Sequence, residues 1–88
     1  MAISLAERAA QLDAEQNLLV KADRDIEEGR RRIRNQEDRI RELMACGYDT
    51  SQAERLADLL RQTLVEWKRH RVLIAQRVEY LAQEVAAG

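Results

Sequence analysis

The sequence has no proline and no phenylalanine, and only three glycines and one cysteine among its 88 residues. Without proline, no position lacks the backbone donor that a helix needs. The single cysteine, Cys46, excludes an intrachain disulfide and favours a reducing compartment. The longest apolar runs, 18–20 and 72–75, are far too short to cross a bilayer. The first ten residues lack the basic and apolar regions of a signal peptide, so the sequence predicts a soluble, cytoplasmic protein.

The residues that the chain does have are mostly helix formers and charges. Charged residues make up 35% of it, and the formal net charge is −1. A chain rich in Ala, Leu, Glu and Arg with a seven-residue period is typical of a coiled coil. The length allows one domain, over residues 1–88. A core of this size rarely contributes more than about 3–5 kcal/mol, so we expect a second copy or a partner to stabilise it.

An apolar ladder with a spacing of seven residues predicts a first helix over about 5–46. It comprises Leu5, Leu12, Leu19, Ile26, Ile33 and Ile40. Companion positions on one side are Ala22, Gly29, Gln36 and Leu43, and those on the other are Ala9 and Met44. Ser4 and Glu7 have the spacing of a capping box at the start of this helix.

A turn over 47–51 should separate this helix from a second one over about 52–86. Gly47 suits the left-handed position that ends many helices. Asp49, Thr50 and Ser51 can each cap the next helix, and the sequence does not choose among them.

The second helix carries a four-three apolar pattern with one polar member, Arg71. The pattern comprises Ala57, Leu60, Leu64, Trp67, Arg71, Ile74, Val78, Leu81 and Val85. Leu56, Leu59, Val72 and Leu73 widen the apolar surface beyond a two-in-seven stripe. A surface of that width is typical of a helix in a bundle of more than two helices.

A short turn makes the two helices antiparallel. If the turn is centred on 48–49, residue i pairs with about residue 97 − i. Ile26 then faces Arg71, and Gly29 lies beside Trp67, where the indole would occupy the room of a side chain. A paired acid would let Arg71 fix this register.

The same register predicts which charged residues of the two helices lie near each other. It also predicts which residues of the first helix extend beyond the end of the second. Glu27 and Glu28 should lie near 68–71, where basic residues cluster. Helices of roughly 63 Å and 52 Å would leave Leu5 and Ala9 overhanging and exposed. We therefore expect an all-α, two-helix antiparallel coiled-coil hairpin that dimerises into a four-helix bundle.

Basic residues form the sharpest charge feature and suggest an alternative function. This basic belt comprises Arg30, Arg31, Arg32, Arg34, Lys68 and Arg69. Such a belt can hold phosphates, so a nucleic-acid-binding accessory protein is the alternative prediction. Consecutive residues on a helix point in different directions, and the chain is net acidic, so a solvated helix face is the simpler interpretation.

No combination of residues indicates an enzyme, a metal site or a cofactor site. His70 is the sole histidine, and with Glu66 it offers two of the three or four ligands that a metal needs. Cys46 is not predicted to be a catalytic thiol, because the chain has no second histidine with which to build a Cys/His pair and a third orienting group. We predict no catalytic, metal-binding or cofactor-binding residues.

The central part of the chain resembles a class of short, uncharacterised bacterial helical-hairpin proteins. The similarity comprises Gly29, Ile33, Gln36, Ile40, Leu43, the turn Gly47-Tyr48-Asp49-Thr50, Ala53, Leu56 and His70-Arg71. It implies a hairpin and no particular activity. Tyr80 and Glu84 also match the C-terminal signal of small secreted WXG-type hairpins, but the turn lacks their tryptophan.

The function predicted from the sequence is self-association or docking to a partner protein. The expected interaction surface comprises Leu59, Val72, Leu73, Leu5 and Ala9. We expect a homodimer, with an unknown protein partner as the alternative and no contact with a membrane.

Overall fold

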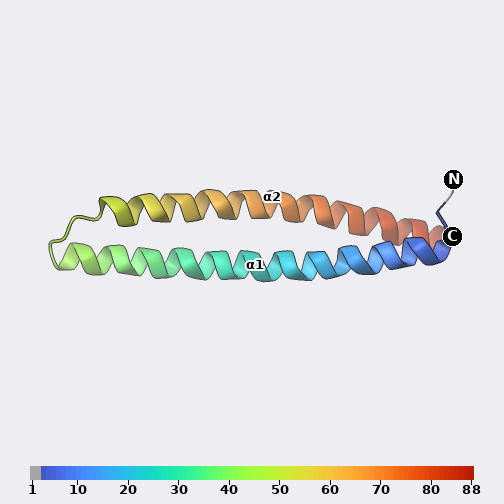
Figure 1. Cartoon of the computed structure of the whole chain (residues 1–88), viewed down its shortest axis with the longest axis horizontal. Coiled ribbons are helices and arrows are strands. Elements are labelled where there is room, and N and C mark those ends of the chain that lie inside the picture. The colour runs from blue at the N-terminus through green and yellow to red at the C-terminus, as the bar shows by residue number, and fades with distance from the viewer. Residues whose placement is uncertain (1–2) are drawn as a thin grey trace.

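The computed structural model describes residues 3–88 and consists of two long helices, α1 (Leu5–Ala45) and α2 (Ser51–Ala87). They run antiparallel, side by side, and the start of α1 and the end of α2 lie at the end opposite the connecting loop (Figure 1). The hairpin measures 65 × 17 × 14 Å. The all-α hairpin predicted from the sequence is confirmed. Each helix boundary lies within one residue of the expected position.

The start of α1 is capped by Ser4. The backbone N–H of Glu7 donates to Ser4 Oγ at 3.1 Å, and Ser4 itself has an extended backbone. This bond satisfies one of the four backbone donors that a helix N-terminus leaves free. It is one half of the capping box that the sequence predicts.

The end of α1 is closed by a Schellman motif around Gly47. Gly47 has a φ of +76°, in the left-handed region that glycine tolerates best. The N–H of Tyr48 donates to the Leu43 carbonyl at 2.9 Å, and the N–H of Gly47 donates to the Met44 carbonyl at 3.0 Å. Both bonds satisfy carbonyls of the last turn, as the motif requires. The role predicted for Gly47 is confirmed.

Asp49 provides the side-chain cap of α2. Its Oδ1 accepts from the backbone N–H of Ser51 at 3.0 Å and from the Ser51 hydroxyl at 2.7 Å. Thr50 occupies the formal cap position, but its side chain makes no capping bond. Because these bonds favour the charged form, they lower the pKa of Asp49 below its ordinary value.

The core is one seam between the helices. Among residues 3–88, three side chains are buried, and they are Ile26, Ala57 and Ile74. The rest of the expected seam is half-buried, apart from exposed Leu5. Two helices cover only one side of each other, so most seam residues keep some contact with water.

A second row of α1 also faces α2, and half of it is polar. The row comprises Arg8, Glu15, Ala22, Gly29, Gln36 and Leu43, all half-buried. The sequence predicts its last four members and misses the first two, because an apolar period does not include charged residues. Each polar member contacts a residue of α2.

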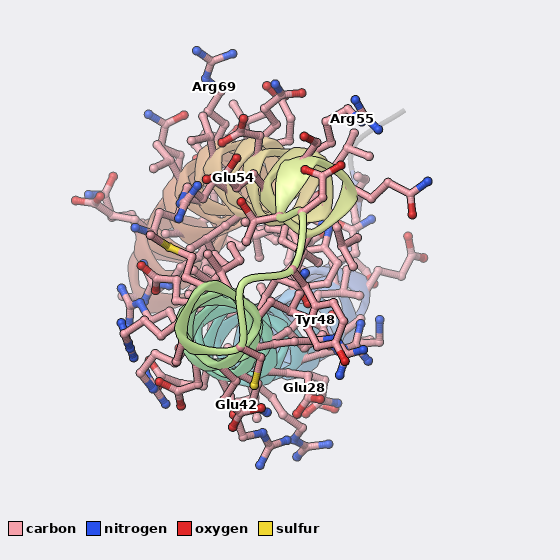
Figure 2. The ribbon with its side chains drawn as sticks, turned by 90° about the vertical axis from the view of Figure 1, so that its left-hand side faces the viewer. Glu28, Glu42, Tyr48, Glu54, Arg55 and Arg69 are labelled. Carbon is pink, nitrogen blue, oxygen red and sulfur yellow. The ribbon has the colours of Figure 1, made fainter. Side chains whose placement is uncertain are left out.

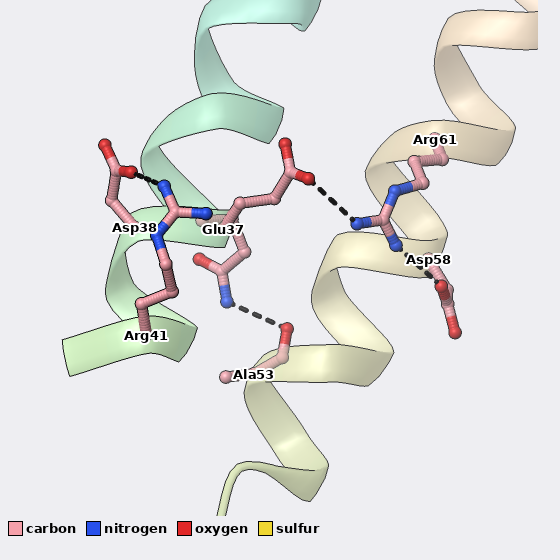
Figure 3. Close-up of polar contacts among 7 residues, drawn as sticks. Glu37, Asp38, Arg41, Ala53, Asp58 and Arg61 are labelled. Carbon is pink, nitrogen blue, oxygen red and sulfur yellow. Dashed lines mark hydrogen bonds and ion pairs between the residues drawn. The ribbon is translucent and has the colours of Figure 1, made fainter. Parts of the chain in front are cut away.

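These cross-helix pairs supply the polar contacts of the seam. Arg8 lies 3.3 Å from a Glu84 carboxylate oxygen, and Gln36 donates to the Ala53 carbonyl at 2.9 Å (Figure 3). Glu15 Oε2 lies 3.1 Å from Arg77 Nε. That oxygen is buried and accepts no well-directed hydrogen bond from residues 3–88, so the contact is electrostatic. Polar partners at these levels favour one alignment of the helices over others.

The observed register differs from the expected one from the middle of the hairpin to its open end. Arg71 pairs with Asp23, one turn before Ile26. A Cβ added to Gly88 would lie 2.9 Å from Leu5 Cδ1, so the end of α2 reaches the start of α1. The predicted overhang of α1 is therefore wrong. The reason is visible in Figure 1, where the loop folds back and α2 begins inside the end of α1.

Candidate interaction surface

Shallow grooves run along both sides of the seam, and one side is strongly charged. One groove there is lined by Glu37, Ile40, Arg41, Glu54, Ala57, Asp58 and Arg61, and the next by Asp23, Ile26, Glu27, Arg30, Lys68, Arg71 and Val72. The two sets lie 14 residues apart on each helix, which is four turns and therefore the same side. We call this side the charged flank.

Ion pairs already occupy the charged flank. Arg61 lies between Asp58 of its own helix, at 2.9 Å, and Glu37 of α1, at 3.6 Å (Figure 3). Arg41 pairs with Asp38 within α1. A surface whose charges are paired internally offers little to an apolar partner.

The opposite side of the seam is less charged. Its grooves are lined by Lys21, Ala22, Asp25, Trp67 and His70, and by Gln36, Arg39, Leu43, Asp49, Gln52, Ala53 and Leu56. Here Trp67, Leu43 and Leu56 provide large apolar side chains. The two sides of the hairpin therefore differ in chemistry.

The exposed large apolar side chains of the helices are concentrated on α2. They are Leu56, Leu59, Val65, Val72, Leu73 and Tyr80, each between 46% and 61% exposed. Those of α1 are Leu5, Leu18, Val20 and Met44. The outer face of α2 between its two flanks is polar, and Arg69 points from it away from α1 (Figure 2).

The five residues of the predicted surface are all exposed, but they do not form one patch. Leu59 and Leu73 are 14 residues apart on one flank of α2. Val72 lines the charged flank instead. Leu5 and Ala9 lie on α1 at the open end of the hairpin (Figure 1). The sequence alone does not separate these places, because the pattern that marks apolar residues does not say which groove each borders.

Most of the basic belt is paired with acids of its own helix. Arg30 pairs with Glu27, and both Arg31 and Arg32 pair with Glu28. Glu27 does line one groove with Lys68 and Arg71, as predicted, but the ion pairs of both acids are with arginines of their own helix. Acids three or four residues away lie within easier reach than those of a neighbouring helix.

The α2 members of the belt are similarly placed on the surface. Arg69 pairs with Glu66 at 3.1 Å, and both side chains are largely exposed. Lys68 lines the groove that Arg30 borders. Arg34 is exposed on α1. The belt is thus a set of solvated charges on two helices.

Chemistry-bearing residues do not gather anywhere in the described chain. Cys46 is a free, exposed thiol at the loop, and His70 lies in the middle of α2. Among residues 3–88, no group of three or more His, Cys, Asp and Glu side chains could hold a metal ion. Neither α1 nor α2 is both long and apolar enough to cross a membrane.

Comparison of the chain with protein-family models, curated proteins and solved structures finds no match.

Proposed function

We propose that this protein is a non-enzymatic coiled-coil module that acts by associating with another helical surface, in the first place that of a second copy. The observation that supports this is the exposure of six large apolar side chains on α2 of a hairpin with three buried side chains among residues 3–88. Covering apolar surface contributes roughly 25 cal/mol per Å². A second layer of helices would supply the core that one seam does not.

The proposed arrangement is a four-helix bundle of two hairpins. Hairpins with wide apolar faces form such bundles because each helix then contacts two neighbours. A closed two-fold dimer is the commonest way to bury such a face. The exposed Cys46 thiol supports the reducing cytoplasm as the compartment.

The test is the mass of the protein in solution, measured by size exclusion with light scattering at low and high salt. We expect a species near twice the chain mass of 10.2 kDa at both salt concentrations. Apolar association should tolerate salt, whereas association through exposed ion pairs should weaken. A monomer under both conditions would overturn the proposed self-association.

The nucleic-acid alternative has less support. The arginines at 30, 31 and 32 already pair with carboxylates, and binding a phosphate would have to displace them. A salt-dependent mobility shift with nucleic acid would favour this alternative.

A further inference from the structure

One flank of α2 repeats the spacing of the seam. Positions one residue before each seam position follow the same three-four order, and they are Leu56, Leu59, Thr63, Glu66, His70, Leu73, Arg77, Tyr80 and Glu84. A one-residue shift rotates the stripe by about 100° around the helix. A second helix can therefore pack along it as α1 packs along the seam. We call Leu56, Leu59, Leu73 and Tyr80 the apolar flank.

The structure places this flank on the less charged side of the hairpin. Leu56 and His70 line the grooves of that side, and Leu73 follows His70 by one turn. Leu59, Leu73 and Tyr80 are 60%, 54% and 61% exposed. Val65 and Val72 lie on the other side of α2, where Val72 borders Lys68 and Arg71. The apolar flank is the surface of α2 that lacks a partner.

We infer that the apolar flank of α2 binds the same flank of a second copy, antiparallel and across a two-fold axis near His70, an inference that rests on the proposed function. Leu59 and Tyr80 lie at nearly equal distances along the stripe on the two sides of His70. An antiparallel two-fold maps such a stripe onto itself. Leu59 then meets Tyr80 of the other copy, and Leu73 meets Glu66.

Charge selects this alignment over its rivals. A parallel pair would place Glu66 on Glu66, Arg77 on Arg77 and Glu84 on Glu84, and like charges in contact are unfavourable. In the antiparallel pair, none of these three residues faces its counterpart in the other copy. It places Thr63 opposite Arg77 and Leu56 opposite Glu84, so no two formal charges of the same sign face each other along the stripe. Sliding one helix by seven residues toward its N-terminal half would bring the two Glu66 carboxylates together.

The overlap is large enough for a stable dimer. Residues 56–84 of α2 span roughly 42 Å at 1.5 Å per residue. Across a hairpin 17 Å wide, the covered area is about 700 Å² per copy, near the ~800 Å² of standard interfaces. Leu18 of α1 is also exposed, and Lys21 and Asp25 place the neighbouring turn of α1 on this side. Both helices of each hairpin would then contribute.

The first arm of the test compares two neighbouring substitutions. Leu73→Glu should convert the dimer to a monomer, raising the dissociation constant by well over tenfold, since the new carboxylate would face Glu66 of the other copy and like charges in contact are unfavourable. Val72→Glu adds the same charge at a residue of similar exposure, 52% against 54%, on the charged flank, and should leave the dimer intact. Circular dichroism checks that both variants keep the helical hairpin.

The second arm measures orientation with spin labels on the polar outer face of α2. In a Cys46→Ala background, Gln62→Cys and Gln83→Cys each carry one label per copy. The antiparallel dimer offsets the two labels along the axis by roughly 22 Å at position 62 and roughly 40 Å at position 83. A dimer with both copies pointing the same way gives equal distances at the two positions.

The outcomes separate this inference from the proposed function. Loss of the dimer in Leu73→Glu alone, with the longer distance at position 83, supports both. A dimer that survives Leu73→Glu, that Val72→Glu breaks, or that gives equal label distances overturns this interface and leaves self-association standing. A monomeric wild-type protein overturns both.

Discussion

The two internal glycines of the hairpin serve opposite purposes. Gly47 has a φ of +76° and ends α1, and glycine is favoured there because it adopts the left-handed backbone without strain. Gly29 lies inside α1 against Leu64 and Trp67, where helical backbone needs no glycine. The sequence predicts the neighbourhood of Gly29 and Trp67, and the structure confirms it. The idea that the indole leaves no room for a side chain holds only for side chains larger than alanine.

Gly29→Ala should therefore stabilise the hairpin. An added Cβ would lie 3.4 Å from Leu64 Cδ1 and 3.6 Å from the nearest Trp67 ring carbon, which are ordinary contacts. Alanine is favoured over glycine inside a helix by about 1 kcal/mol. We expect thermal unfolding to shift upward by about 4–8 °C per kcal/mol gained. A lower melting temperature would show that the ring does not accommodate the methyl group.

Gly47→Ala should destabilise the hairpin by about 1 kcal/mol, because an L-residue is strained in the left-handed region. No atom lies within 4 Å of the Cβ that this substitution would add, so the effect is conformational alone. The measurement is the same thermal melt, with Gly29→Ala as the matched glycine substitution of opposite sign. An unchanged melting temperature would mean that the Schellman closure contributes nothing.

Asp49 should make the start of α2 sensitive to acid. Its pKa lies below the ordinary value of 3.8 because its carboxylate accepts both bonds from Ser51. The contribution to stability is therefore full above pH 3.8 and is lost as the pH falls through the lower pKa of the folded state. Asp49→Ala should lower the melting temperature at pH 7, and the difference from wild type should shrink toward pH 2.

Thr50→Ala is the control for this experiment, since the Thr50 side chain makes no capping bond. It should change the melting temperature little at any pH. If Asp49→Ala and wild type differ equally at pH 7 and pH 2, the charged form of Asp49 does not provide the cap.

At the scale of the helices, Arg71 is the one charged residue of the apolar pattern on α2. It pairs with Asp23 of α1, which raises the pKa of the guanidinium and keeps it charged. A polar residue on a seam favours one register and one oligomeric state, at a cost in stability. The pair joins the two helices about midway along the hairpin.

Arg71→Leu should keep or raise the melting temperature and should allow mixed oligomers. The new side chain adds apolar contact at the seam, while the exposed Asp23 carboxylate stays hydrated. Light scattering should then show more than one species. Asp23→Asn is the matched control, because it removes the charge pair and adds no apolar surface. A single species of lower stability for Arg71→Leu would contradict the assigned role.

The sequence was sufficient to predict the helices but not their relative offset. Period-seven spacing and Gly47 identify two helices and the turn, because these signals are local. The offset depends on how the loop folds back after Gly47 and on which residue caps α2, and three candidates had that chemistry. The polar seam residues were missed for another reason. A charged residue is ordinarily assigned to the exposed face of a helix, and only the pairs of Arg8 with Glu84 and of Glu15 with Arg77 show that these two lie beside the seam.

The sequence predicts that the residues of the proposed surface are exposed, but it does not predict where on the hairpin they lie. The exposure of Leu59 and Leu73 can be predicted, because the apolar residues of α2 cover a wider face than a two-in-seven seam buries. Their separation from Val72 depends on which groove each one borders, and only the paired helices define those grooves. The ion pairs of the belt within α1 were not predicted, because the sequence does not show that Glu27 and Glu28 pair with arginines three or four residues away instead of with those of α2.

At the scale of the whole molecule, the arrangement of charge decides whether the hairpin attracts nucleic acid. The formal net charge is −1, so attraction would have to come from a local excess of cations. The densest cationic stretch is 30–34, and Glu27 and Glu28 pair with three of its arginines. The wild-type protein should therefore give no mobility shift with duplex DNA or RNA, even at low salt.

Removing those two acids should reveal the latent cationic surface. The double variant Glu27→Gln, Glu28→Gln leaves Arg30, Arg31 and Arg32 without their carboxylates and should bind nucleic acid at low salt. Its affinity should fall steeply with salt, with a slope of about one per phosphate contacted. Glu42→Gln with Glu79→Gln changes the net charge equally but lies outside this cluster, and it should bind far more weakly. Equal binding by both double variants would mean that net charge alone governs the interaction. A salt-dependent shift by the wild-type protein would instead show that phosphates displace the paired carboxylates, and the nucleic-acid alternative would then replace the association proposed here.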